Sequence, residues 1–225
     1  MDSQKSWSEL ASSSLLLKAV SSWRKDPESW LEGSFERLPE TVRVNPLRTD
    51  SKWVEEWILE QGGKSVPWFK GSGTAWEMPF SRGLAEGKTR EMLIALHETG
   101  RITRQEIVSM IPVLALQVST GDYVLDMCAS PGSKTTQISE YLGEGGVVFA
   151  NEISNSRVNT LVSNVHRHGS KSAVIINHDG RHLPKMPNRG FDKVLVDAPC
   201  TGSATTRKNP EAVSYTHLRA HETPV

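Results

Sequence analysis

The second half of the sequence alternates short apolar runs with longer polar segments, and this rhythm constrains the fold more than any other feature. The four apolar runs occupy residues 123–128, 147–151, 173–177 and 193–197. Strands that alternate with helical segments in this way are typical of a parallel sheet with helices on both faces. We therefore expect an α/β fold whose ligand lies beyond the carboxyl ends of the strands.

The first third of the chain has a different composition. All seven tryptophans lie between Trp7 and Trp76, whereas the only cysteines are Cys128 and Cys200. Helical patterns at 9–23 and 51–61, with a strand-like pattern at 42–44, predict a small α+β module. The shift in composition predicts two domains, one over residues 1–95 and one over residues 96–212.

Charge and cysteine content exclude few partners. The 26 basic and 26 acidic residues balance, so net charge neither favours nor excludes a nucleic acid. Two cysteines far apart in sequence favour a reducing compartment. No apolar run is long enough for a signal peptide or membrane span, so we expect a protein of the cytoplasm, or of the nucleus in a eukaryote, that is not secreted.

A loop of small residues follows the first predicted strand and opens a helix. It consists of Cys128, Ala129, Ser130, Pro131, Gly132, Ser133 and Lys134. Small residues let a ligand approach the backbone, and a helix N-terminus offers free N–H groups. The loop matches neither G-x-x-x-x-G-K-[ST] nor G-x-G-x-x-G, which excludes a P-loop and a dinucleotide loop.

S-adenosyl-L-methionine remains as the ligand of this loop, with a plain tight turn as the alternative. Its carboxylate suits the helix N-terminus, and its ribose calls for an acid at the end of the next strand, where Glu152 follows. After the third strand, Asp179 could accept a hydrogen bond from the adenine amine, although Asp-Gly is also a common turn.

The fourth strand ends in Asp197-Ala198-Pro199-Cys200. A thiolate that adds to carbon 6 of cytosine activates carbon 5 toward a methyl group, and a carboxyl group can bond the ring nitrogen and amine. From the residues alone Cys200 would be the nucleophile and Asp197 the base-binding acid. The alternative for Cys200 is an inert buried thiol.

Four motifs in this order resemble the Nop2/Sun family of RNA cytosine-5 methyltransferases. They are DMCASPGSKTTQ (126–137), ANE (150–152), NHDGRHLP (177–184) and DAPCTG (197–202). The tracts at 75–82 and 100–112 resemble the eukaryotic-type tRNA methyltransferase branch. The resemblance implies a class I, Rossmann-like methyltransferase domain that uses S-adenosyl-L-methionine, preceded by a Trp-rich domain of RNA-binding type.

The resemblance also implies roles for the site residues. The loop 128–134, Glu152, Asp179 and Asp197 would bind the cofactor, and Lys134 would lie near the target base. The family's nucleophile is generally a second cysteine in a Thr-Cys motif nearer the C-terminus, whereas the Pro-Cys cysteine, here Cys200, assists product release.

The sequence departs from the family near its end. No Thr-Cys motif is present, and Thr201-Gly202-Ser203-Ala204 stands where the family usually has Ser-Gly-Asp-Gly. Residues 213–225 match no family element and resemble translated sequencing-adapter read-through. We therefore expect a C-terminally truncated methyltransferase with a non-native tail and no activity of its own.

Between residues 153 and 193 basic side chains outnumber the two acids, which suits RNA phosphates but also an ordinary solvated helix face. We expect RNA as the partner, with tRNA ahead of rRNA, and neither a metal nor a membrane; the histidines of this segment lack a zinc-binding pattern. Two further functions stay open. One is a non-catalytic RNA-binding protein that kept the fold, and the other is a DNA cytosine-5 methyltransferase with Cys200 as its nucleophile.

Overall fold

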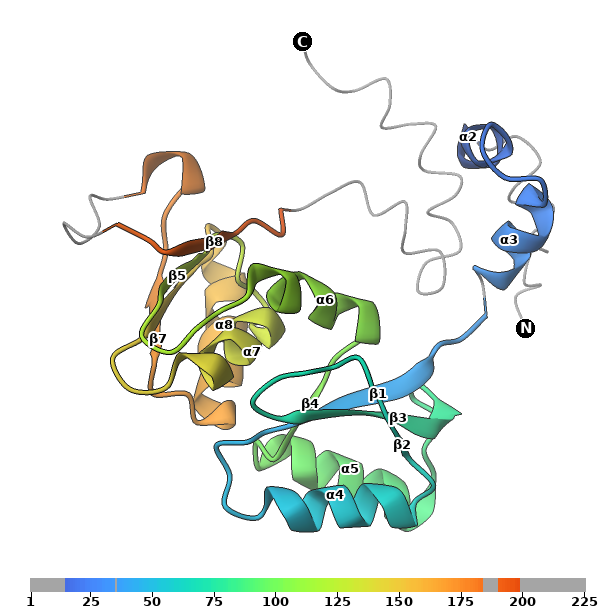
Figure 1. Cartoon of the computed structure of the whole chain (residues 1–225), viewed down its shortest axis with the longest axis horizontal. Coiled ribbons are helices and arrows are strands. Elements are labelled where there is room, and N and C mark those ends of the chain that lie inside the picture. Colours follow the sequence, from blue (N-terminus) through green and yellow to red (C-terminus); the bar gives the residue numbers. More distant parts are fainter. Residues whose placement is uncertain (1–14, 35, 184–189, 199–225) are drawn as a thin grey trace. The chain divides into compact units, whose positions relative to one another are not determined.

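The computed structural model describes residues 15–34, 36–183 and 190–198 (Figure 1). The chain divides into two compact units, one over Pro39–Ala198 and the other from Met1–Leu38 with Pro199–Val225. Of the latter, helices α2 (Leu15–Ser21) and α3 (Pro27–Gly33) are described. Proline is well tolerated at the first helical position, and α3 begins at Pro27 as the sequence predicts.

The larger unit begins with a four-stranded antiparallel sheet. Its strands are β1 (Pro39–Val44), β2 (Lys64–Ser65), β3 (Thr74–Ser81) and β4 (Ile102–Arg104), in the order β2-β3-β1-β4. Helix α4 (Ser51–Glu60) follows β1 and helix α5 (Gly87–Glu98) follows β3. This βαββαβ arrangement is a ferredoxin-like split βαβ module. Its last strand comes from residues after 95, and the division into domains at that point remains a prediction.

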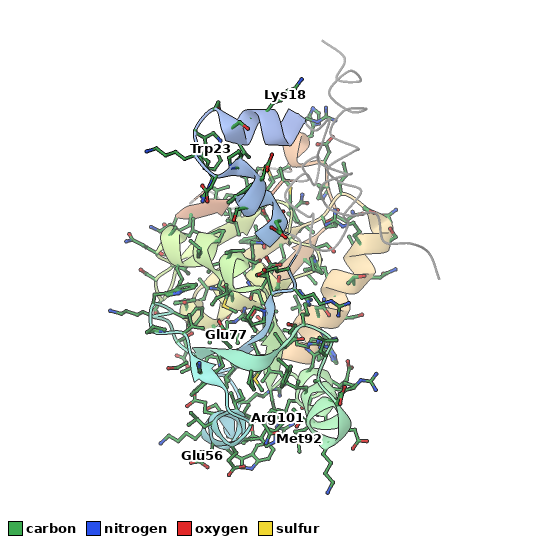
Figure 2. The ribbon with its side chains drawn as sticks, turned by 90° about the vertical axis from the view of Figure 1, so that its right-hand side faces the viewer. Lys18, Trp23, Glu56, Glu77, Met92 and Arg101 are labelled. Carbon is green, nitrogen blue, oxygen red and sulfur yellow. The ribbon has the colours of Figure 1, made fainter. Side chains whose placement is uncertain are left out.

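One face of this first sheet packs on α4 and α5. Alternate residues of β1, Val42 and Val44, join a buried apolar cluster with Ile58 of α4 and Leu96 of α5. Figure 2 shows the two helices nearly end-on and side by side, with Glu56 and Met92 labelled. Because side chains alternate along a strand, Arg43 points to the opposite face.

A second, parallel sheet carries the predicted strands in the order β7-β6-β5-β8. They are β5 (Tyr123–Asp126), β6 (Val147–Asn151), β7 (Ala173–Ile176) and β8 (Lys193–Leu195). Helix α7 (Ser133–Leu142) connects β5 to β6, and α8 (Asn155–His168) connects β6 to β7. Helix α6 (Ile107–Leu116), with Pro112 inside it, precedes the sheet. The predicted α/β fold with a parallel sheet is confirmed.

The described helices cover one face of the parallel sheet, not both as the sequence suggested (Figure 1). Val148 of β6 packs in a cluster with residues of α6 and α7, and Ala150 of the same strand packs on Leu161 of α8. On the other face Val174 is 45% and Val194 46% exposed. The reason is topological. Each of β6 and β7 is added on the same side of the strand before it, so that the right-handed crossovers place α7 and α8 on one face.

No helix among the described residues combines the length and the apolar character that crossing a bilayer requires.

Candidate functional site

The order of the parallel strands places a ligand site between β5 and β8. From β5 the chain proceeds outward to β7 and then returns to β8 on the other side of β5. In open α/β sheets a crevice forms at this reversal, beyond the carboxyl ends of the strands. The segments that enter it are the loop after β5, which contains Cys128–Lys134, and the residues after β8, which include Asp197.

The loop after β5 is held by β6 and α8. The Ala129 N–H donates to the Asn151 carbonyl at 2.8 Å. The Ser130 hydroxyl donates to the Arg157 carbonyl at 2.9 Å, and Arg157 donates back to the Ser130 carbonyl at 2.8 Å. The Asn164 amide donates to the Pro131 carbonyl at 2.6 Å. These hydrogen bonds fix the loop on its outer side, so its path is set before any ligand binds.

Gly132 is required where the loop turns into α7. Its φ of +105° lies in the region that favours glycine. A Cβ atom there would come within 3.0 Å of the Leu161 Cδ1 atom, and Leu161 is fully buried. Loop and α8 can approach this closely only because residue 132 has no side chain.

Glu152 lies where the second strand's acid was predicted, directly after β6. It is 2% exposed, and its Oε1 accepts a hydrogen bond from the Ser154 N–H at 2.9 Å. Its Oε2 has no hydrogen-bond partner among the described residues, although Arg157 Nη1 lies 3.5 Å away. A buried carboxylate oxygen that accepts no hydrogen bond raises the free energy of the folded chain unless a ligand donates one.

Asp126, the last residue of β5, is a second such carboxylate, and sequence reasoning missed it. Its Oδ2 accepts from the Thr135 hydroxyl at 2.7 Å, while its Oδ1 is buried without a partner in the described part of the chain. Burial raises the pKa of Asp126 to about 6. The available signal was an acid that ends a buried strand immediately before the small-residue loop.

Asn151 joins the ends of three strands. Its side-chain amide donates to the Met127 carbonyl at 3.1 Å and to the His178 carbonyl at 3.0 Å, and its oxygen accepts from the His178 N–H. Asn151 therefore ties the loop after β5 to the segment after β7. This segment contains Asp179.

The structure brings Asp179 to the same edge but pairs it with Arg181. The carboxylate accepts from the Arg181 backbone N–H at 2.9 Å and from the Arg181 guanidinium at 2.6 Å. The hydrogen bond from the Arg181 side chain, followed by that from its backbone, holds the pKa of Asp179 well below its usual range. Asp179 is therefore ionised, and its remaining exposure leaves it free to accept a further hydrogen bond.

Lys134 lies in the first turn of α7, directly after the loop. Its ammonium group donates to Asp197 Oδ2 at 2.7 Å and to the Ser109 hydroxyl of α6 at 2.9 Å. The structure thus brings together Lys134 and Asp197, residues 63 positions apart. Ser109 was not predicted as a site residue, although it lies in the tract at 100–112.

Cys128 lies within this group of acids. Burial raises the pKa of its thiol, and the charges of Asp126, Glu152 and Asp197 raise it further. At neutral pH Cys128 is therefore a protonated thiol and not a nucleophile. The second predicted cysteine, Cys200, lies outside the described residues.

The donor and acceptor set fits S-adenosyl-L-methionine. Two buried carboxylates, Asp126 and Glu152, each have an oxygen at the carboxyl edge of the sheet that accepts no hydrogen bond from the described residues. The ammonium group and the ribose hydroxyls of this cofactor could donate hydrogen bonds to these oxygens. Its sulfonium cation suits an edge that carries negative charges. Residues 128–134 supply backbone beside them.

Comparison with known proteins matches residues 113–219 to the family described as the 16S rRNA methyltransferases RsmB/F. The human 28S rRNA (cytosine(4447)-C(5))-methyltransferase is 34% identical over 80% of this chain and 21% of its own length. The multisite-specific tRNA:(cytosine-C(5))-methyltransferase of Saccharomyces cerevisiae is 31% identical over 92% of this chain and 36% of its own. Ribosomal RNA small subunit methyltransferase F of Shewanella piezotolerans is 35% identical over 83% and 39%.

Solved structures agree on the fold. A methyltransferase homologue from Pyrococcus horikoshii has a TM-score of 0.63 and 27% identity, and the match covers 88% of this chain and 62% of that one. NSun6 from the same organism has a TM-score of 0.64 at 19% identity, over 83% and 70%, and supports the fold alone. The present chain spans about a fifth to two fifths of the length of the three curated relatives named above.

Proposed function

Because the chain belongs to the RsmB/F family, whose relatives are named RNA cytosine-C5 methyltransferases, we propose that it is the cofactor-binding part of an enzyme that methylates carbon 5 of cytosine in tRNA. The observation that carries this proposal is the pair of buried carboxylates at the strand reversal, Asp126 and Glu152. Each has an oxygen that accepts no hydrogen bond from the described part of the chain. A methyltransferase needs a cationic methyl donor at this place, and these oxygens suit one.

The cofactor of this family is S-adenosyl-L-methionine, which supplies the methyl group. In the proposal Glu152 accepts hydrogen bonds from its ribose and Asp126 from its amino group. The backbone of residues 128–134 lies along it, and Asp179 accepts from the adenine amine. Asp197 borders both the cofactor and the base.

Lys134 and Asp197 are assigned to the target base. Asp197 can hydrogen-bond the ring nitrogen and amine of cytosine, and Lys134 keeps it in place through their 2.7 Å contact. A cysteine thiolate adds to carbon 6, and carbon 5 then takes the methyl group. Loss of the carbon 5 proton and cleavage of the carbon–sulfur bond restore the ring, and Cys200 is assigned to this release.

The attacking cysteine is not one of the two in this sequence. Cys128 follows Met127 and Cys200 follows Pro199, so neither belongs to a Thr-Cys motif. The proposal is therefore that this chain binds the cofactor and RNA but does not transfer methyl groups. Burial and the neighbouring acids, which raise the pKa of the Cys128 thiol, support it.

Two observations favour tRNA over rRNA as the substrate. The yeast tRNA enzyme aligns with 92% of this chain, whereas the human rRNA enzyme aligns with 80%. The tracts at 75–82 and 100–112, moreover, resemble the tRNA branch.

A binding and transfer experiment tests the proposal. The purified 225-residue chain is titrated by calorimetry with S-adenosyl-L-homocysteine, with unmodified tRNA and with an rRNA fragment. It is then incubated with tritiated S-adenosyl-L-methionine and either RNA. We expect cofactor binding, tighter RNA binding for tRNA, and no tritium in 5-methylcytosine. Absence of cofactor binding would overturn the proposed cofactor site. Tighter binding of rRNA than of tRNA would overturn the proposed substrate. Methyl transfer would overturn the proposal that the attacking cysteine is missing from this chain.

A further inference from the structure

Arg43 is a buried charge that links the first sheet to the candidate site. It lies in β1, between Val42 and Val44, and points away from the apolar cluster that these two valines share with α4 and α5. Its side chain is fully buried. A guanidinium cannot lose its charge in a protein, so its burial requires that its donors be bonded.

Its partners lie along helix α7. The Arg43 Nε donates to both oxygens of Glu140 at 3.0 Å, and its Nη2 donates to the Thr136 hydroxyl at 3.0 Å. Its Nη1 lies 3.4 Å from the Ser133 carbonyl, in the first turn of α7. The guanidinium therefore contacts α7 from its first turn to its last, directly after the cofactor loop.

A second path leads from Arg43 to Lys134. The Arg43 Nη1 also donates to the Gln105 side-chain oxygen. The Gln105 amide in turn donates to the Ser109 carbonyl at 3.2 Å and to Gln137 of α7 at 3.1 Å. Ser109 then receives the Lys134 ammonium at 2.9 Å. Polar contacts thus lead from β1 to the Ser109 carbonyl, and the hydroxyl of the same residue contacts the lysine assigned to the target base.

Stability alone does not account for such a residue. Replacing a buried ion pair by uncharged residues of similar volume is often neutral or stabilising, because desolvation offsets the attraction. An arginine fork does, however, fix the direction of several bonds at once. The placement of α7 and of Lys134 is the property that these contacts determine.

We infer that Arg43 is a positioning residue for the methyltransferase site, which orients the loop at residues 128–134 through α7 and the Lys134 ammonium through Gln105 and Ser109. The inference rests on the proposed function of that site. Glu140 takes part as the anionic partner, and its Oε1 also lies 3.0 Å from His168 Nε2. Arg43 itself touches neither cofactor nor base.

Three variants of the 225-residue chain test the inference. Arg43→Met combined with Glu140→Gln removes both charges, while the amide introduced by the second substitution can still bond His168. Arg43→Lys keeps the charge but not the fork. Arg104→Met is the matched control, because Arg104 pairs with the equally buried Glu40 in the same sheet but has no bond to α6 or α7 among the described residues.

Each chain is studied by thermal unfolding, by calorimetry with S-adenosyl-L-homocysteine, and by the amine NMR signal of ¹⁵N-labelled Lys134. We expect the double variant to unfold near the wild-type temperature, to bind S-adenosyl-L-homocysteine about tenfold more weakly, and to lose the Lys134 signal to solvent exchange. Arg43→Lys should show both effects in part. Arg104→Met should lower the unfolding temperature yet keep both the affinity and the signal.

Two outcomes would overturn the inference. One is wild-type affinity together with an unchanged Lys134 signal in folded Arg43 variants. The other is an equal loss of affinity in Arg104→Met, which would reduce the effect to general destabilisation. If the wild-type chain binds no S-adenosyl-L-homocysteine, the proposed cofactor site is wrong, while the Lys134 signal still decides whether Arg43 positions this side chain.

Discussion

Asp126 is the residue whose ionisation connects the fold to the ligand. Burial raises its pKa to about 6 from an ordinary 3.8, so the folded chain holds this proton more tightly than the unfolded chain. Through this group, stability is greatest below pH 3.8 and declines as the pH rises toward 6. The ammonium group of S-adenosyl-L-methionine or S-adenosyl-L-homocysteine has the opposite preference, because it favours the ionised carboxylate.

We therefore predict that affinity for S-adenosyl-L-homocysteine rises about tenfold between about pH 5 and pH 7, as Asp126 loses its proton. Calorimetry at several pH values across this range measures the change. Asp126→Asn should bind weakly with little dependence on pH over the same range. A slope in this variant equal to that of the wild type would assign the titration to another group.

Single residues differ in how far the sequence predicts them. Glu152 and Lys134 follow from local order, since each occupies a fixed place after or beside a predicted strand. Arg43 could not be found in this way, because its partner Glu140 is 97 residues distant and nothing near it in sequence marks a buried charge. The contact of Ser109 with Lys134 could not be predicted from the sequence either, because it forms only when α6 packs beside α7.

Among the elements, β3 shows why a strand can escape prediction. It contains Pro79, which cannot donate to a sheet and argues against a central strand. The structure accommodates Pro79 at an irregularity, where the register with β1 shifts between the Pro39–Ser81 and Thr41–Glu77 pairs. Prolines are found at such bulges. The parallel strands, in contrast, were predictable because each is a short apolar run between helical segments.

The unequal faces of the parallel sheet yield a prediction for its strands. Val148 is fully buried beneath α6 and α7, whereas Val174 on the neighbouring strand is 45% exposed on the opposite face. Val148→Ala should lower the free energy of unfolding by about 2 kcal/mol and Val174→Ala by less than about 1 kcal/mol. Urea unfolding followed by circular dichroism measures both, and equal losses would show that the second face is covered.

For the molecule as a whole, the two sheets of residues 39–198 are joined by buried contacts. Besides the Arg43–Glu140 pair, the Asn45 amide donates to the His168 carbonyl at 2.8 Å, and Ala75 of β3 shares an apolar cluster with Met110 of α6. Buried polar bonds and apolar packing of this kind favour one cooperative transition. The domain boundary predicted near residue 95 lies within the first sheet, because β4 comprises Ile102–Arg104.

We predict that both sheets unfold together. In a chain with Trp7, Trp23 and Trp30 replaced by phenylalanine and Cys200 by serine, tryptophan fluorescence reports the first sheet and the thiol reactivity of Cys128 reports the second. Their urea midpoints should coincide. Separate midpoints would show that the two sheets unfold as independent domains.

The packing of Arg43 and Ala75 against α6 and α7 also bears on how RNA would be held. In RNA-recognition modules with a four-stranded sheet, bases stack on aromatic side chains of the open sheet face. Here the corresponding face of the first sheet makes internal contacts with α6 and α7, so its side chains are not available for stacking on RNA bases. Attraction would then rest largely on arginines and lysines that displace counterions from phosphates, and affinity should fall steeply as the salt concentration rises.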